Sequence, residues 1–381
     1  MIKIQGKKVG KMKIGILSPD NPHKGLHRDA ELLAWALTSE VEGGNLIPKE
    51  DVDIFHVKNL LFDSLSTESS DSSEPTPWSI GGGTALDSWL MNIDVLFISE
   101  QLNSYLFENI LPSIKIVYIP NLEWARLAGV DGDVATWISS VRSFIPRGLI
   151  VLAKSPTIGA VLVQHNIECT VVDWSIPDEI RTELRSNRRK KKRVLMNAGL
   201  GGWRSRRGVD VMIEAINSIP SNMPIKFIIK TIKPWEKYEL GEIPDGVELV
   251  EGFLSRNEMN ELVESADLII YPSRFEGFGL SLLEALHKGI PVMCTNGWPM
   301  NELQTIQDPR LLIEVSKTVP LRLAWSFEPK AESIVANLVA IKKKKLSKLF
   351  PVSEVTRGLK ERQDTFRIQI QSIVNNLMKM A

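Results

Sequence analysis

The fold of this chain is decided by the stretch Tyr271-Pro-Ser-Arg-Phe-Glu276-Gly-Phe-Gly-Leu-Ser-Leu-Leu-Glu284-Ala-Leu. Residues 266–271 are apolar and rich in β-formers, whereas residues 280–288 have helical composition. The glycines between them therefore fall where a strand turns into a helix. Such glycines let the backbone approach a phosphate, and the first free amides of the helix point at it. We predict an anion-binding turn made by Gly277, Phe278, Gly279 and Leu280.

Two carboxylates flank this turn, with Glu276 before the predicted helix and Glu284 within it. A negative side chain does not favour a phosphate, but its oxygens accept hydrogen bonds from hydroxyl groups. We therefore expect the two glutamates to hold the hydroxyls of a ribose and of a second sugar beside it. The alternative is an ordinary strand, turn and helix that binds nothing.

Three further elements accompany the Glu276-x7-Glu284 frame in a fixed order. Tyr271-Pro272-Ser273 precedes it, and the segments Gly289-Ile-Pro-Val292 and Thr295-Asn-Gly-Trp-Pro-Met-Asn-Glu302 follow it. Together they resemble the C-terminal half of GT-B glycosyltransferases of the family 4 type, also called group 1. Four elements in order are far more specific than a single Gly-x-Gly.

This resemblance implies an α/β protein of the GT-B fold, with two Rossmann-like doubly wound domains facing a cleft and C-terminal helices packing back toward the N-terminal domain. It also implies a retaining hexosyl- or pentosyltransferase, which moves a sugar from a nucleoside diphosphate sugar, UDP- or GDP-linked, to a hydroxyl acceptor. No metal and no tightly bound cofactor is expected. Glu276 would hold sugar hydroxyls, Glu284 the ribose, and residues 298–302 would line the sugar pocket.

An arginine-rich loop lies upstream, between an apolar strand at residues 193–196 and a helix predicted over residues 209–218. Its Arg207-Gly208-Val209-Asp210 is similar to the Lys-Gly-Val-Asp of the family, where the cation holds the donor pyrophosphate. Arginine suits this task because its fork of donors matches phosphate oxygens. Arg207 is therefore expected to stabilise the leaving diphosphate.

The same loop departs from the family at one step. The usual Gly-Arg after the strand is Gly199-Leu200 here, so we expect Arg204 or Arg206 to supply the missing cation. Gly201 and Gly202 are expected to bring the backbone close to the phosphates. The alternative is that these arginines form only a solvated face.

The whole chain has the composition of a two-domain protein, with 381 residues, 43% apolar and 24% charged. Apolar strands alternate with helical stretches, which indicates parallel sheets covered on both faces. The expected strands are residues 13–17, 53–57, 94–98, 115–119 and 149–152, then 193–196, 225–229, 247–250, 267–271 and 290–293. We assign an acceptor-side domain to residues 1–176, a basic hinge to 177–192, a nucleotide-sugar domain to 193–350 and a returning C-terminal helix to 351–381.

The first half would carry the acceptor side. Residues 19–29 follow the first strand, at the position where family members bring a glycine-rich loop to the donor phosphates, and Gly25 is the glycine available there. The family often has a histidine near the fourth strand, and none stands near residues 119–124. Asn121 or Glu123 is expected to replace it as the catalytic contact to sugar or acceptor, with a core-capping role as the alternative.

Metal, disulfide and membrane chemistry are not expected. Cys169 and Cys294 are too few for a disulfide framework or a cysteine metal cluster. Asp51-Val-Asp53 and Asp131-Gly-Asp133 have Asp-x-Asp spacing, but Mg²⁺ needs more oxygen ligands, so we interpret both as structural. No segment has transmembrane length and residues 1–13 lack an apolar core, which favours a cytoplasmic protein, with peripheral membrane association left open.

The charge distribution suggests a polyanionic partner. The chain balances 46 basic against 46 acidic residues, yet Arg188–Arg193 is an unbroken run of cations. This run is expected to dock DNA or an anionic membrane carrying a lipid-linked glycan, unless it is a solvated linker. Other functions also stay open: a GT-B-shaped nucleic-acid or partner-binding protein without turnover, a DNA-modifying glycosyltransferase acting on hydroxylated bases, a phosphorylase, or a sugar-nucleotide hydrolase.

Overall fold

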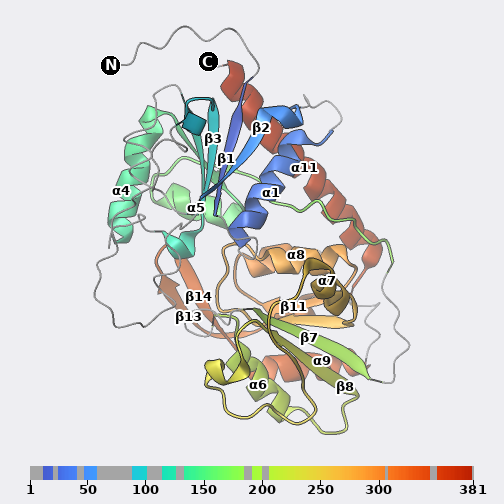
Figure 1. Cartoon of the computed structure of the whole chain (residues 1–381). Coiled ribbons are helices and arrows are strands. Elements are labelled where there is room, and N and C mark those ends of the chain that lie inside the picture. Colours follow the sequence, from blue (N-terminus) through green and yellow to red (C-terminus); the bar gives the residue numbers. More distant parts are fainter. Residues whose placement is uncertain are drawn as a thin grey trace. The chain divides into compact units, whose positions relative to one another are not determined.

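The computed structural model describes ten ranges of the chain, listed at the end of this paragraph. Within it the chain divides into two compact units (Figure 1). One unit contains Met1–Ser175 with Gln363–Ala381, and the other contains Ile176–Arg362. The described ranges are residues 12–19, 25–40, 47–57, 88–100, 114–125, 133–183, 191–199, 206–304, 308–343 and 350–379.

The first unit is built on a parallel sheet in the order β2-β1-β3-β4-β5-β6. Its strands are apolar along most of their length, as in Val95–Ile98, because helices cover parallel strands on both faces. The strands are β1 (Ile14–Pro19), β2 (Val52–Val57), β3 (Val95–Glu100), β4 (Lys115–Pro120), β5 (Leu149–Ala153) and β6 (Thr170–Val171). The helices are α1 (Gly25–Thr38), α4 (Val134–Phe144) and α5 (Pro156–Gln164), with short 3-10 turns η1 (Lys49–Asp51), η3 (Leu122–Trp124) and η4 (Ile145–Arg147).

The second unit repeats this plan with the order β12-β11-β10-β7-β8-β9. Its strands are β7 (Lys192–Gly199), β8 (Ile225–Thr231), β9 (Glu248–Val250), β10 (Leu268–Tyr271), β11 (Val292–Thr295) and β12 (Leu312–Ile313). The helices are α6 (Val209–Ser218), α7 (Arg256–Glu264), α8 (Leu280–His287) and α9 (Ala331–Lys343), with η6 (Trp235–Tyr238), η7 (Met300–Gln304) and η8 (Pro309–Leu311). An antiparallel hairpin of β13 (Val315–Leu321) and β14 (Ala324–Pro329) completes it.

The predicted GT-B architecture of two Rossmann-like sheets is confirmed, and every strand expected from the sequence overlaps a strand of the structure. The start of one helix is set by its own sequence. Ser255 and Glu258 form a capping box that starts α7, because the Ser255 hydroxyl accepts from the Glu258 amide and the Glu258 carboxylate accepts from the Ser255 amide. The short strands β6 and β12 and the β13–β14 hairpin were not predicted.

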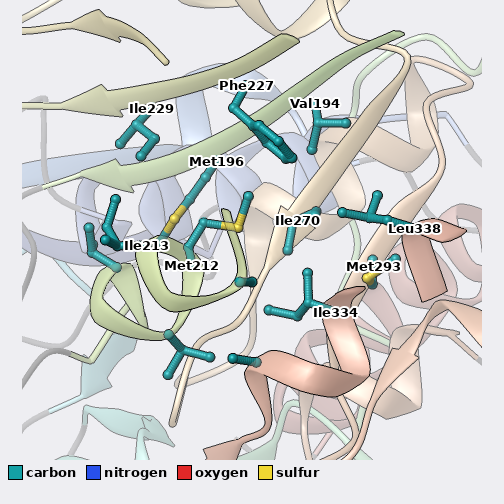
Figure 2. Packing of buried hydrophobic residues seen from close by; sticks show 14 of the residues in the cluster. Val194, Met196, Met212, Ile213, Phe227, Ile229, Ile270, Met293, Ile334 and Leu338 are labelled. Atoms are coloured by element: carbon teal, nitrogen blue, oxygen red, sulfur yellow. The ribbon is translucent and has the colours of Figure 1, made fainter. Parts of the chain in front are cut away.

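One face of the second sheet forms a continuous apolar core (Figure 2). Alternate residues of neighbouring strands, such as Val194 and Met196 of β7, point to the same side and pack on α6 and α9. Met212 and Ile334 come from these two helices. This packing fixes the strand register, and with it the position of the loops that leave the carboxyl ends of the strands.

The last helix, α11 (Val352–Lys379), supplies residues 363–379 to the first unit. The Gln371 side-chain amide donates to the carbonyls of Ala36 at 3.0 Å and Ser39 at 2.7 Å, at the end of α1. The Phe366 ring lies 4.9 Å from that of Trp174. The C-terminal helix therefore packs on the N-terminal domain, as expected of this fold.

Candidate active site

The glycine turn lies between β10 and α8, where the sequence placed it. Gly279 is the residue before α8 and has a left-handed backbone, with φ of +100°. Its carbonyl accepts the Leu282 amide at 2.9 Å, and a Cβ at this position would lie 2.9 Å from Leu282 Cδ1. The first turn of α8 carries no acidic side chain, so its positive end is free to attract an anion.

Two arginines hold the carboxylate of Glu276 beside this turn. Arg206 Nη1 donates to Oε2 at 3.0 Å, and Arg207 Nη1 donates to Oε1 at 2.6 Å. Glu276 is only 7% exposed, so this pair of contacts is shielded from water. The group carries two positive charges and one negative charge, and its net positive charge favours an anion.

Arg207 is packed against the Tyr271 ring, with its guanidinium carbon 5.0 Å from the ring centroid. Burial lowers the pKa of Arg207 to about 10, an effect that the Glu276 carboxylate opposes. The guanidinium therefore stays charged near neutral pH. A charge held in a site of low dielectric attracts a phosphate more strongly than one in water.

The arginine loop packs against the segment that links β10 to the glycine turn. Gly208 has φ of +66°, and a Cβ there would lie 2.1 Å from the carbonyl oxygen of Pro272. The Arg274 amide donates to the Arg206 carbonyl at 2.7 Å. This close approach is what brings Arg206 and Arg207 to Glu276, and only glycine permits it.

Arg274 joins three segments and was missed by the sequence reasoning. Its guanidinium donates to both carboxylate oxygens of Asp210, at 2.8 and 2.7 Å. It also donates to Glu328 of β14, at 2.8 and 2.5 Å. Although burial favours the neutral form, these carboxylates hold the pKa of Arg274 above its usual range. The sequence did contain a signal for this pairing, because Arg274 lies in the stretch around the glycine turn and Asp210 ends the Arg207-Gly208-Val209-Asp210 motif.

The hairpin supports the loop that was predicted to line a sugar pocket. A Cβ on Gly297 would lie 2.5 Å from the Phe327 ring, and the Trp298 ring meets Phe327 edge-on at 6.4 Å. The Phe327 amide also donates to the Arg274 carbonyl at 2.8 Å. Phe327 of β14 therefore contacts both the loop at Gly297 and Trp298 and the segment at Arg274 that leads into the glycine turn.

The carboxyl end of the second sheet also carries buried hydroxyls. Ser273 follows β10 and Thr295 ends β11, and both are fully buried. In the part of the chain that the structure describes, neither hydroxyl oxygen has a hydrogen-bond partner. Glu284 lies in the middle of α8 and is half-buried. Polar atoms thus gather around the glycine turn, as a polar ligand requires.

In the first unit, Asn121 and Glu123 lie just beyond the carboxyl end of β4 and are buried. The Asn121 amide nitrogen donates to Glu100 Oε2 at 3.2 Å, and its oxygen accepts from Lys154 Nζ at 3.3 Å. Lys154 also donates to Asp29 of α1 at 2.7 Å. The structure therefore joins Asn121 to Glu100 and Lys154, and through Lys154 to Asp29, three residues that were not predicted.

The remaining predicted residues are placed as follows. Gly25 is the first residue of α1. Gly201, Gly202 and Arg204 lie outside the described residues, as do Asp131 and positions 188–190 of the basic run.

The two Asp-x-Asp pairs make structural contacts wherever they are described. Asp51 accepts from Lys13 at 2.8 Å, Asp53 accepts from the Trp89 indole at 2.7 Å, and Asp133 caps α4. Among the described residues, no cluster of three or more His, Cys, Asp or Glu side chains is arranged to hold a metal. Over the same ranges, no helix is long and apolar enough to cross a membrane.

Two Rossmann-like sheets, with an arginine loop and a glycine turn at the carboxyl end of the second, define a protein of GT-B type. Comparison with known proteins shows that residues 180–317 match the family model described as glycosyl transferases group 1. The resemblance inferred from the Glu276-x7-Glu284 frame is confirmed.

Individual relatives match a limited part of the chain. Lipopolysaccharide glucosyltransferase WaaG of Escherichia coli is 37% identical over 93 residues, which are 24% of this chain and 25% of WaaG. O-antigen chain mannosyltransferase B of Escherichia coli is 27% identical over 104 residues, 26% of this chain and 27% of that protein. The chain thus matches about a quarter of the length of these curated relatives.

Solved structures match the fold over nearly the whole chain. The glycosyltransferase from Rickettsia africae has a TM-score of 0.62 at 15% identity, covering 97% of this chain and 100% of that one. The WaaG structure has a TM-score of 0.57 at 17% identity, covering 94% and 99%. Anabaena HepE in complex with UDP-glucose has a TM-score of 0.60 at 12% identity, covering 97% and 100%.

Proposed function

We propose that the protein is a retaining, metal-independent glycosyltransferase of the family 4 type, which moves a hexose or pentose from a nucleoside diphosphate sugar to a hydroxyl acceptor. The observation that carries the proposal is the buried Glu276 held by Arg206 and Arg207 beside the glycine turn of α8. In this arrangement the two arginines can bind a diphosphate, and the carboxylate that they contact can accept hydrogen bonds from sugar hydroxyls. HepE was solved with UDP-glucose, so a UDP-linked donor is a candidate for this chain beside a GDP-linked one.

Donor binding would rearrange the ion pairs of the site. The diphosphate takes over donors of Arg206 and Arg207, and the freed oxygens of Glu276 accept from hydroxyls of the transferred sugar. The amides at the start of α8 add a second positive surface, while Glu284 holds the ribose. As the bond between the sugar and the diphosphate breaks, these groups stabilise the growing negative charge on the leaving group.

Retention follows from a front-face path in this proposal. The acceptor hydroxyl attacks the oxocarbenium-like centre from the side on which the diphosphate departs. Glu276 is already engaged with two arginines, so it is better placed to hold hydroxyls than to act as a nucleophile. Trp298 and its neighbours up to Glu302, braced by Phe327, would line the sugar pocket.

Thermal unfolding with a panel of nucleotide sugars tests donor binding. UDP-glucose, UDP-galactose, UDP-N-acetylglucosamine and GDP-mannose are compared with and without EDTA. A donor at a hundred times its dissociation constant should stabilise the protein by about 2.7 kcal/mol, and EDTA should not change this. Glu314→Gln, an exposed residue of the same unit, serves as the control variant. Failure of every nucleotide sugar to stabilise the protein would contradict the proposal.

The two glutamates should affect different kinetic constants. If Glu284 holds the ribose in ground state and transition state alike, Glu284→Ala raises the donor KM and leaves kcat nearly unchanged. Glu276→Ala mainly lowers kcat, because it removes contacts that strengthen as the sugar–diphosphate bond breaks. Steady-state diphosphate release on both variants measures the split. Parent-like kinetics in Glu276→Ala would refute its assignment.

A polyanionic acceptor belongs to the same proposal, as does peripheral docking of a cytoplasmic protein on an anionic membrane. Its support is the unbroken cationic run Arg188–Arg193. To separate the two acceptors, the affinity for duplex DNA and for anionic vesicles is measured across salt concentrations, in the parent protein and in a variant with this run neutralised. Affinity for the correct ligand should depend steeply on salt in the parent protein and much less in the variant. A protein that binds such a ligand but never releases diphosphate would be a binding module rather than an enzyme.

A further inference from the structure

The hairpin of β13 and β14 (Figure 1) presents a tryptophan to solvent. Trp325 of β14 is 40% exposed, whereas Phe327, two residues further along the strand, is 8% exposed. Side chains two residues apart on a strand emerge on the same face, about 7 Å from each other. Pro320 lies opposite Trp325 in the register, and Thr318 lies opposite Phe327. These four residues form one face of the hairpin, which we call the aromatic face.

The loop at Gly297 and Trp298 covers only the inner part of the aromatic face. A Cβ on Gly297 would lie 2.5 Å from the Phe327 ring, and the Trp298 ring meets Phe327 edge-on at 6.4 Å. Trp325 lies nearer the turn of the hairpin, beyond this contact. Three aromatic side chains therefore follow one another from the loop predicted to line the sugar pocket to the exposed end of the hairpin.

The hairpin is joined to the arginine loop through Arg274. The Phe327 amide donates to the Arg274 carbonyl at 2.8 Å. The Arg274 guanidinium donates to Glu328 of β14 and to Asp210, which follows the arginine loop. All of these residues belong to the second unit. A ligand on the aromatic face is therefore held at a set position relative to the residues proposed to bind the donor.

The chemistry of the aromatic face matches a neutral sugar. The C–H groups of a pyranose ring are slightly positive and pack on the negative face of an aromatic ring. The four side chains of the face carry no charge, and Thr318 adds a hydroxyl. Lys317 and Glu328 pair with each other on the opposite face. Surfaces that stack nucleic-acid bases combine aromatic rings with cations, which the aromatic face lacks.

The exposed apolar area of the hairpin is too small for a stable protein partner. Residues 315–329 are all described, and Val319 and Trp325 are their exposed large apolar side chains. The two point to opposite faces, since Val319 pairs with Ser326. A stable protein interface buries about 800 Å² per partner around several apolar anchors. A single indole ring matches the size of a single sugar ring instead.

We propose that the aromatic face binds a neutral sugar of the acceptor, which stacks on Trp325 while the acceptor chain continues toward Trp298. The inference rests on the proposed function and identifies the acceptor as a carbohydrate chain. Trp325 is a binding residue that takes no part in forming or breaking the glycosidic bond. Its role is to select glycans and to align them with the sugar pocket.

Glycan binding in the absence of donor tests this role. The full chain is applied to an array of neutral gluco-, manno-, galacto- and N-acetylglucosamine oligosaccharides, and the affinity for each bound glycan is measured by calorimetry. Trp325→Ala should weaken binding about tenfold or more, and Trp325→Phe, which keeps a ring, should weaken it less. Absence of binding to every neutral glycan, or an unchanged affinity in Trp325→Ala, would overturn the inference.

Phe253→Ala is the matched control for this experiment. It also removes an exposed aromatic ring, 62% in water, but Phe253 follows β9, at the edge of the second sheet opposite to β12. Glycan affinity should therefore be the same as in the parent protein. An equal loss in Phe253→Ala and Trp325→Ala would show that the binding is not specific to the aromatic face, which contradicts the inference.

Two further measurements identify other occupants of the aromatic face. Sedimentation that shows a dimer in the parent protein and a monomer in Trp325→Ala would make the face an interface between copies of this chain. Binding of a single-stranded thymidine oligonucleotide in place of glycans, lost in Trp325→Ala, would assign the face to nucleic acid. Either result overturns the inference. If glycans bind through Trp325 but no nucleotide sugar stabilises the parent protein, the proposed function fails and the carbohydrate surface stands.

Discussion

Arg207→Ala is expected to lower turnover by about thirtyfold to a thousandfold, equivalent to about 2 to 4 kcal/mol of transition-state stabilisation. The substitution removes a half-buried charge that would face the leaving diphosphate. It also removes the shorter of the two contacts to Glu276, at 2.6 Å against 3.0 Å for Arg206. Arg206 remains to neutralise Glu276, so the fold should survive.

Arg206→Ala and Arg207→Lys are the matched comparisons. Arg206 is the more exposed of the two, so Arg206→Ala should cost less turnover than Arg207→Ala. Arg207→Lys keeps the charge but loses the fork and should fall between parent and alanine variant. Diphosphate release is measured for all three with EDTA present. Activity that EDTA abolishes and Mg²⁺ restores would show that a metal, rather than Arg207, stabilises the leaving group.

Gly208→Ala is expected to destabilise the second unit by about 3 kcal/mol or more. A left-handed backbone costs an alanine about 1 to 2 kcal/mol, and forcing an atom into a packed space adds about 1 to 3 kcal/mol. The added Cβ would lie 2.1 Å from the Pro272 carbonyl oxygen, a backbone atom that cannot rotate away. The arginine loop would move off the glycine turn, so Arg207 would lose its place beside Glu276.

Gly246→Ala provides the control for this clash. Gly246 also has a left-handed backbone, with φ of +79°, but a Cβ there meets no atom within 4 Å. It should lose about 1 to 2 kcal/mol, from backbone conformation alone. Unfolding both variants in urea, with a spectroscopic signal from each unit, measures the difference between their free energies of unfolding. If both variants lost the same free energy of unfolding, the arginine loop could move away from Pro272 without cost. The close approach at Gly208 would then not be what positions the arginines.

Local sequence was sufficient for the elements and the glycine turn. Apolar β-rich runs such as Val95–Ile98 specify buried parallel strands, because a strand covered on both faces needs no polar alternation. The Ser255 and Glu258 capping box fixed the start of α7. The glycine turn and the two glutamates could be predicted because Gly277, Gly279, Glu276 and Glu284 all lie within one short stretch between a strand and a helix. Short strands such as β12, and a hairpin with proline and polar residues, leave too weak a pattern to find.

Tertiary structure alone decided which side chains meet. Glu276 accepts from Arg206 and Arg207, 70 and 69 residues away in the sequence, and is not free to await a sugar. Lys154 pairs with Asp29, 125 residues away. Such pairings depend on strand order, which places the ends of β3, β4 and β5 side by side, and no local pattern encodes that order. The sequence therefore determined the fold and the glycine and arginine motifs, whereas long-range packing determined the partners and protonation of the charged groups.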